Sequence, residues 1–198
     1  VGVQSVIGSD DPQRVGQFAR KLAHIARWHA LSLYGQTGTG RHLNHYSHTF
    51  ADDVGRLMRR VERVRAVDAK AQNARRCGRG MVNFQKLFSH GVVEFRVFAG
   101  TLNRQKLLHH LATVLGLCRR AAEVQCLGGF RRNKAQEKRT GTALQALMFL
   151  WDFLGWNGSK RPVALGLFGP LHAEFASYRT TAARMCSRFD ARYPNPNL

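Results

Sequence analysis

Residues 81–103 read MVNFQKLFSHGVVEFRVFAGTLN, and this stretch has the clearest strand pattern in the 198-residue chain. Along 91–98, one set of alternate positions is apolar, and the other set carries Glu94 and Arg96. Successive side chains of a strand point to opposite faces of a sheet. We therefore expect strands over 81–87 and 91–98, paired antiparallel, with Glu94 and Arg96 on the same face. A long helix is expected to follow.

The Glu94–Arg96 pair has two interpretations. A carboxylate in an apolar strand needs a partner if it is buried, and an arginine two positions away on the same face can serve. The same spacing also occurs in exposed strand pairs, which contribute little stability. The spacing alone leaves both interpretations open.

The segment resembles the amidoligase family, a branch of the glutamine-synthetase-like carboxylate–amine ligases, in which a run of the form vNl…hgTvEFRxfxGTLN precedes a long helix. The matching residues here are 82–84, 90–98 and 100–103, with Val92 where the family has threonine. Upstream, Leu33 to Gly35 followed by Gly40 and Arg41 is similar to the family's helix, glycine and arginine segment.

The resemblance implies an enzyme that binds ATP with Mg²⁺, activates a carboxylate substrate as an acyl phosphate and transfers it to an amine, with a peptide among the conceivable substrates. It makes Glu94 a catalytic residue and metal ligand, and Arg96 a catalytic contact to phosphate or the transition state. Arg41 becomes a substrate or phosphate contact. The remaining motif positions, taken as substrate- or nucleotide-binding, are Asn83, Thr101 and Asn103.

The acidic strands that precede this region in the family, of the types E-x-E and G-x-H-V-H, are not found in the chain. One carboxylate is a poor site for a hard cation, which prefers several oxygen ligands. We therefore expect either the C-terminal portion of a longer ligase or a catalytically inactive relative, and no ligase activity from these residues alone. The sheet edges are expected to pair with the missing half or a partner chain.

The net charge of +19, from 31 basic and 12 acidic residues, favours an anionic partner. A basic nucleic-acid-binding protein is thus the alternative to a ligase, although a GC-rich genome also enriches arginine. The densest basic clusters are Arg59–Arg60, Arg75–Arg79, Arg119–Arg120 and Arg131–Lys134. No apolar run is long enough to span a bilayer. We expect a cytoplasmic protein with reduced cysteines and no membrane association.

The remaining pattern predicts helices and an α+β fold, in which a partial antiparallel sheet is covered by helices and resembles the C-terminal part of a glutamine-synthetase-like ligase. Residues 1–7 read as a further strand. Helices are expected over 12–33, after Asp52–Asp53, after Asn103, from Thr140 or Thr142 to Gly155, and from Gly169–Pro170 onward. We divide the chain into an amidoligase-like core (1–126), a basic linker (127–140) and a helical extension (141–198).

Side-chain expectations accompany these helices. In the helix after Asn103, the expected core stripe is Leu107, Leu108, Leu111, Val114, Leu115 and Cys118. His109 and His110 are expected to be solvated or half-buried. A weaker alternative is a zinc site, formed by His42, His45 and His48 with Cys77.

Overall fold

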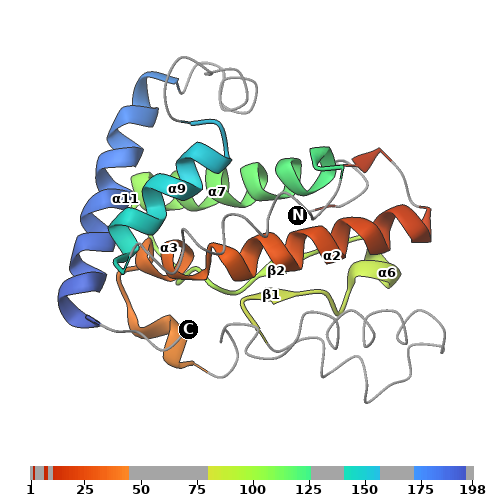
Figure 1. Ribbon diagram of the computed structural model, residues 1–198, viewed down its shortest axis with the longest axis horizontal. Helices are drawn as coiled ribbons and strands as arrows, with labels where there is room; N and C mark the ends of the chain where they lie inside the picture. Colours follow the sequence, from red (N-terminus) through yellow and green to blue (C-terminus); the bar gives the residue numbers. More distant parts are fainter. Residues whose placement is uncertain are drawn as a thin grey trace.

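The computed structural model describes residues 2, 7–8, 11–44, 80–125, 141–156 and 172–194. Helices dominate these residues, and the two strands form one antiparallel sheet (Figure 1). The α+β class is therefore confirmed. In chain order the elements are α2 (Pro12–Trp28), α3 (Ala30–Gly35), the 3₁₀ helix η1 (Gly40–Leu43), β1 (Val82–Asn83), α6 (Leu87–His90), β2 (Glu94–Phe95), α7 (Arg104–Glu123), α9 (Ala143–Phe153) and α11 (His172–Arg192).

The first helix begins where the sequence predicts. Asp11 is its N-cap and accepts a hydrogen bond from the Arg14 backbone N–H at 2.9 Å, and proline occupies the first turn. The expected single helix over 12–33 is wrong in one respect. The helix ends at Trp28, because His29 leaves the helical region (φ −98°, ψ 19°), and α3 begins after it.

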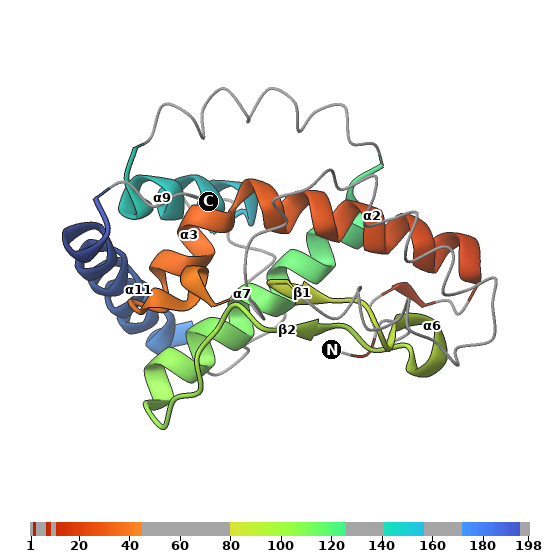
Figure 2. The same ribbon diagram turned by 90° about the horizontal axis from the view of Figure 1, so that it is seen from below.

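The strands are shorter than expected. β1 pairs with β2 over two residues each, with Val82 opposite Phe95 and Asn83 opposite Glu94. The short helix α6 replaces the second half of the expected 81–87 strand, and it ends at Gly91, whose φ of 61° suits glycine. The alternation of faces is confirmed at the buried positions Val93 and Val97. In Figure 2 the strands lie below α2.

The expected strand over residues 1–7 is supported at one end only. Gly2 forms an antiparallel bridge with Val92. Ile7 is helical, so the expectation is wrong there.

Helix α7 starts after Asn103, as predicted, and the structure shows that Asn103 is its N-cap, since its side chain accepts from the Lys106 backbone N–H at 2.9 Å. Its predicted core stripe is wrong in part. Leu107 and Leu111 are 55% and 46% exposed, whereas His109 and His110 are buried. The helix packs against α2 and α11, and its buried face includes both histidines as well as small and apolar residues, so its leucine stripe is rotated partly toward solvent.

Helices α9 and α11 pack against α3, and α11 also contacts α7 (Figure 1). Their buried side chains belong to the same hydrophobic cluster as those of α2, α3 and β1. Thr142 caps α9 as predicted, accepting from Gln145 N at 3.2 Å. The Asp190 carboxylate of α11 also accepts from the first two backbone N–H groups of α9, at 2.6 and 3.1 Å.

Gly35 lies at a close contact between these helices. A Cβ built on it would lie 2.6 Å from the Cβ of Ala143 and 2.9 Å from the sulfur of Cys186. No helix in the described ranges is long and apolar enough to cross a membrane. The helix expected after Asp52–Asp53 and the basic linker at 127–140 fall outside the described residues.

Candidate active site on the two-stranded sheet

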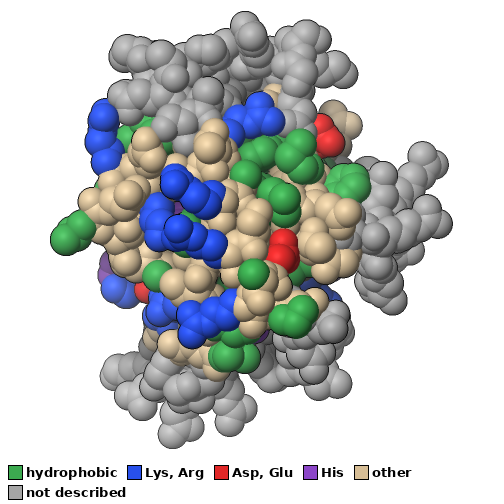
Figure 3. All heavy atoms as spheres, turned by 90° about the vertical axis from the view of Figure 1, so that its left-hand side faces the viewer, with side chains coloured by type: hydrophobic (Ala, Val, Ile, Leu, Met, Phe, Trp, Pro, Cys, Tyr) green, Lys and Arg blue, Asp and Glu red, His purple; other side chains and the backbone are tan. Residues whose placement is uncertain are grey.

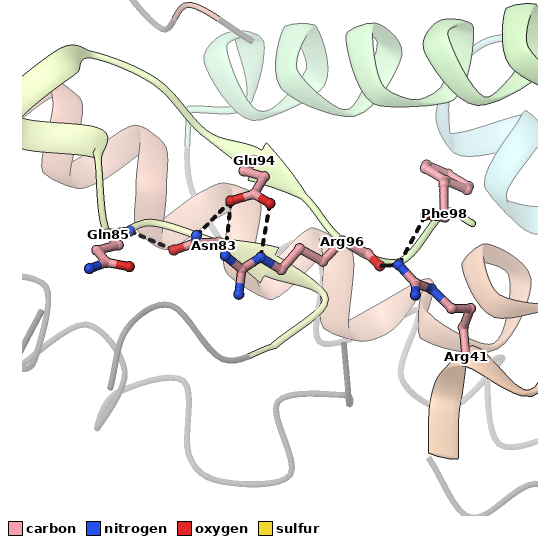
Figure 4. Close-up of polar contacts among 6 residues, drawn as sticks. All are labelled: Arg41, Asn83, Gln85, Glu94, Arg96 and Phe98. Carbon is pink, nitrogen blue, oxygen red and sulfur yellow. Dashed lines mark hydrogen bonds and ion pairs between the residues drawn. The ribbon is translucent and has the colours of Figure 1, made fainter. Parts of the chain in front are cut away.

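Asn83, Glu94 and Arg96 form one polar cluster across β1 and β2 (Figure 4). The Arg96 guanidinium donates to both carboxylate oxygens of Glu94, from Nε to Oε1 at 3.0 Å and from Nη2 to Oε2 at 3.1 Å. The Asn83 amide donates to the same Oε2 at 2.8 Å. Three predicted site residues therefore meet in one place.

The strand register explains this cluster. Asn83 faces Glu94 directly across the antiparallel pair, and Arg96 lies two residues farther along the same face. The side-chain Oδ1 of Asn83 accepts from the Gln85 backbone N–H at 2.8 Å, which turns the side-chain amide nitrogen toward Glu94. The position of Asn83 is thus fixed on both sides of its amide.

Glu94 is ionised and accessible. Its side chain is 54% exposed, and that of Arg96 is 28% exposed. The hydrogen bond from Arg96 lowers the pKa of Glu94, and Asn83 adds to this effect, while partial burial opposes it. The cluster therefore presents a carboxylate on an open surface rather than buried in the core. This geometry matches the exposed alternative for the pair.

Arg41 reaches the same strand from another element. Its Nη2 donates to the backbone carbonyls of Arg96 at 3.0 Å and Phe98 at 3.3 Å. These bonds connect η1 to the segment that follows β2 (Figure 4). The described contacts of Arg41 give it a positioning role for the segment that carries Arg96.

Thr101 and Asn103 lie at the start of α7. The Thr101 hydroxyl accepts from the Asn103 backbone N–H at 3.1 Å, and Asn103 caps the helix. Among the described residues, neither forms a hydrogen bond with the Asn83–Glu94–Arg96 cluster. Their described contacts are those of a turn that starts a helix.

A buried polar network, which sequence reasoning missed, lies beneath this region. His109 Nε2 lies 2.7 Å from the Gln36 side-chain oxygen, which also accepts from the Thr113 hydroxyl at 3.1 Å. His110 stacks on Phe98 with ring centroids 4.2 Å apart. Gln36 had no distinguishing sequence signal, because nothing local indicates that a glutamine after a glycine will be buried.

The two histidines are the clearest correction. They are 1% and 7% exposed, not solvated or half-buried. Burial lowers the pKa of His109 to about 3 and that of His110 to about 4. Because an amide oxygen can only accept, His109 carries its proton on Nε2 and is neutral. Both side chains serve the packing of α7 against the Gln36 turn.

The described residues do not make a magnesium site. Glu94 is the one carboxylate in its cluster, and both of its oxygens already accept hydrogen bonds. Mg²⁺ prefers six oxygen ligands in octahedral geometry. Across the described ranges no three His, Cys, Asp or Glu side chains are grouped so that they could hold a metal ion.

The zinc alternative is described at one position only. His42 is buried, with its ring edge-on to Phe189 and Tyr193 at 5.2 and 4.7 Å. Burial lowers its pKa. His45, His48 and Cys77 lie outside the described residues.

Of the predicted basic clusters, one can be described. Arg119 and Arg120 both pair with the Glu123 carboxylate, at 2.8 and 3.3 Å. The other three, Arg59–Arg60, Arg75–Arg79 and Arg131–Lys134, fall outside the described residues.

The chain matches no family model, no curated protein and no solved structure. A functional proposal must therefore rest on the motif and on the geometry of the cluster.

Proposed function

We propose that this chain supplies part of the active site of an ATP-dependent carboxylate–amine ligase, with Glu94 and Arg96 at its centre. The observation that carries the proposal is the Asn83–Glu94–Arg96 cluster, an ionised carboxylate on an open sheet face held by an arginine and an amide. The same three residues match the family's vN and EFR motif positions.

In this function Arg96 binds phosphoryl or carboxylate oxygens, since its planar guanidinium suits two-toothed contacts with either group. The Glu94 carboxylate orients that guanidinium, and the bonds from Arg41 hold the backbone of the segment that carries Arg96. Bound ATP with Mg²⁺ would supply the activated phosphoryl group. The described part of the chain contributes a single carboxylate to such a site, so the other cation ligands must come from elsewhere in the polypeptide or from a partner chain.

The test uses the natural polypeptide that contains these residues, with ATP, Mg²⁺, free amino acids or short acidic peptides as carboxylates, and hydroxylamine as the amine. Formation of the acyl phosphate from ATP releases ADP, and hydroxylamine then displaces inorganic phosphate to give a hydroxamate, which is detected as its coloured complex with added ferric ion. We expect Glu94→Gln to lower the rate by about 100-fold or more, by analogy with the loss of one charge-stabilising group in an active site. Arg96→Lys is expected to lower it as well, because the guanidinium fork is lost.

Glu123→Gln is the matched control, since Glu123 is also an exposed carboxylate paired with arginine but lies on α7. It should leave the rate unchanged. Full activity of Glu94→Gln would refute the site. A wild-type polypeptide that forms no hydroxamate from these carboxylates would refute the ligase proposal and favour the inactive relative. The 198 residues by themselves are expected to be inactive.

A further inference from the structure

Three arginines form a stripe on the outward face of α11. Arg184, Arg188 and Arg192 follow one another at four-residue spacing, and all three are exposed. Residues four apart share one face of a helix, with Cβ atoms about 5–6 Å apart. At about 1.5 Å per residue the stripe is about 12 Å long. Figure 3, which looks onto the α11 side of the molecule, shows Lys and Arg side chains gathered there.

The charge of this Arg184–Arg188–Arg192 stripe is not neutralised within the described part of the chain. None of its members forms an ion pair there. The nearby acid, Asp190, points inward and accepts the first two N–H groups of α9. Like charges at this spacing destabilise a helix by about 0.2–0.5 kcal/mol per pair. An anionic partner would remove that repulsion.

The composition of the face indicates which anion. The large hydrophobic side chains exposed among the described residues lie on other elements; they are Leu43, Leu102, Leu107, Leu111, Met148 and Phe149. A helix that inserts into a membrane surface needs an apolar face beside its basic one, and a protein interface needs a buried anchor. On α11 itself, no large hydrophobic side chain is exposed among the described residues, although hydrophobic side chains of other elements lie on the same side of the molecule (Figure 3). Repeated single phosphates require cations alone.

We propose that the α11 stripe binds the phosphate backbone of nucleic acid. The contact is independent of base sequence, because arginine–phosphate pairs position a nucleic acid without reading it. The net charge of +19 adds long-range attraction to these direct contacts. This surface is separate from the Asn83–Glu94–Arg96 cluster, and the inference does not depend on ligase activity.

The test measures fluorescence anisotropy of labelled single-stranded RNA and duplex DNA of mixed sequence across a salt series. The variant is Arg184→Gln/Arg188→Gln/Arg192→Gln, which keeps good helix formers on an exposed face. Each phosphate contact contributes about 0.9 to the slope of log K against log salt for duplex DNA and about 0.7 for a single strand. Losing three contacts should therefore reduce the slope by about 2.7 and about 2.1, respectively.

The control is Arg14→Gln/Lys21→Gln/Arg119→Gln, which removes the same charge from the groove between α2 and α7. It should leave the slope nearly unchanged. An equal reduction by both triple variants would overturn the proposal, because general attraction would then explain binding. Absence of salt-dependent binding to both nucleic acids would also overturn it, as would stripe-dependent binding to phosphatidylserine vesicles alone. Circular dichroism verifies that the variants stay folded.

Discussion

Acidification should destabilise this protein through buried histidines, and three of the four described ones have the largest pKa shifts. His29, His109 and His110 are each at most 8% exposed. Burial lowers the pKa of His29 to about 4, that of His109 to about 3 and that of His110 to about 4, and the nearby Lys106 contributes to the last shift. Below pH 6.5 the unfolded chain binds protons at these rings while the folded chain does not. Stability is therefore retained above pH 6.5 and lost as the pH falls toward 4.

The size of the loss follows from the two pKa values of each ring. At pH 5 an unfolded histidine with pKa about 6.5 gains about 2 kcal/mol from protonation that a buried one with pKa about 4 does not gain. At pH 7 the same difference is well below 1 kcal/mol, because the unfolded ring is then mostly neutral. The three rings together should lower the free energy of unfolding by about 5 kcal/mol between pH 7 and pH 5. Domains of this kind are stable by about 5–15 kcal/mol, so the loss is a large fraction of the total.

Urea unfolding followed by circular dichroism at pH 7, 6 and 5 measures this loss. With a slope of about 2 kcal/mol per molar urea, the midpoint should fall by about 2.5 M. His29→Phe removes one titrating ring and keeps an aromatic side chain against Phe153, whose ring centroid is 4.9 Å away. This variant should lose about 2 kcal/mol less than the wild type over the same pH range. His90→Gln, at an exposed position, is the control and should behave as the wild type.

A loss below about 1 kcal/mol between pH 7 and 5 would contradict the reasoning, since it would mean that the folded protein protonates these rings at little cost. If His29→Phe has the same pH dependence of stability as the wild type, His29 does not contribute to the acid destabilisation. The range stops at pH 5 because carboxylates titrate below it and would add to the signal.

Three further predictions concern packing, capping and thiol chemistry. Gly35→Ala should destabilise the protein by about 1–3 kcal/mol in thermal or urea unfolding, because the new methyl group enters the contact with α9 and α11. Gly16→Ala, in the interior of α2 with open space around it, should instead stabilise by about 0.5–1 kcal/mol; the opposite order would refute the packing described. Asp190→Ala should cost about 1–2 kcal/mol, since two N–H groups at the start of α9 lose their acceptor; a neutral result would show that Thr142 alone suffices. Burial raises the pKa of Cys118 to about 12 and also raises the pKa of Cys186. Neither thiol should therefore react with iodoacetamide at pH 8 until the protein unfolds, which peptide mass spectrometry can measure. Rapid labelling of either cysteine in the folded protein would contradict its burial.

Several elements could be predicted from local sequence because their determinants are local. Asp11 with the following proline caps α2 as predicted, and Thr142, one of the two expected candidates, caps α9. Capping depends on a side chain and the backbone two or three residues away, so a short window contains the whole interaction. The alternation around Glu94 and Arg96 was also local, and it placed both side chains on one face.

The candidate site was predictable only in part. The two-residue spacing of Glu94 and Arg96 predicts that both side chains share one face of the strand. It does not predict whether that face is buried or exposed to solvent. The meeting with Asn83 depends on the register of β1 and β2, which α6 and Gly91 set by the length and turn of the connection. Arg41 was expected at a substrate, whereas its described bonds go to backbone carbonyls 55 and 57 residues away.

By itself, the sequence determined the helix starts, the alternating strand faces and the large positive charge. The tertiary structure decided which face of each helix is buried, as α7 illustrates. Its leucines favoured one stripe by hydrophobicity, but the helix buries His109 and His110, because Gln36 and Phe98 from distant segments give those rings a hydrogen-bond partner and a stacking partner. The tertiary structure likewise turned Asp190 inward and left Arg184, Arg188 and Arg192 outward. The physical reason is that burial depends on the partners a side chain meets, and those partners come from elements far away in the chain.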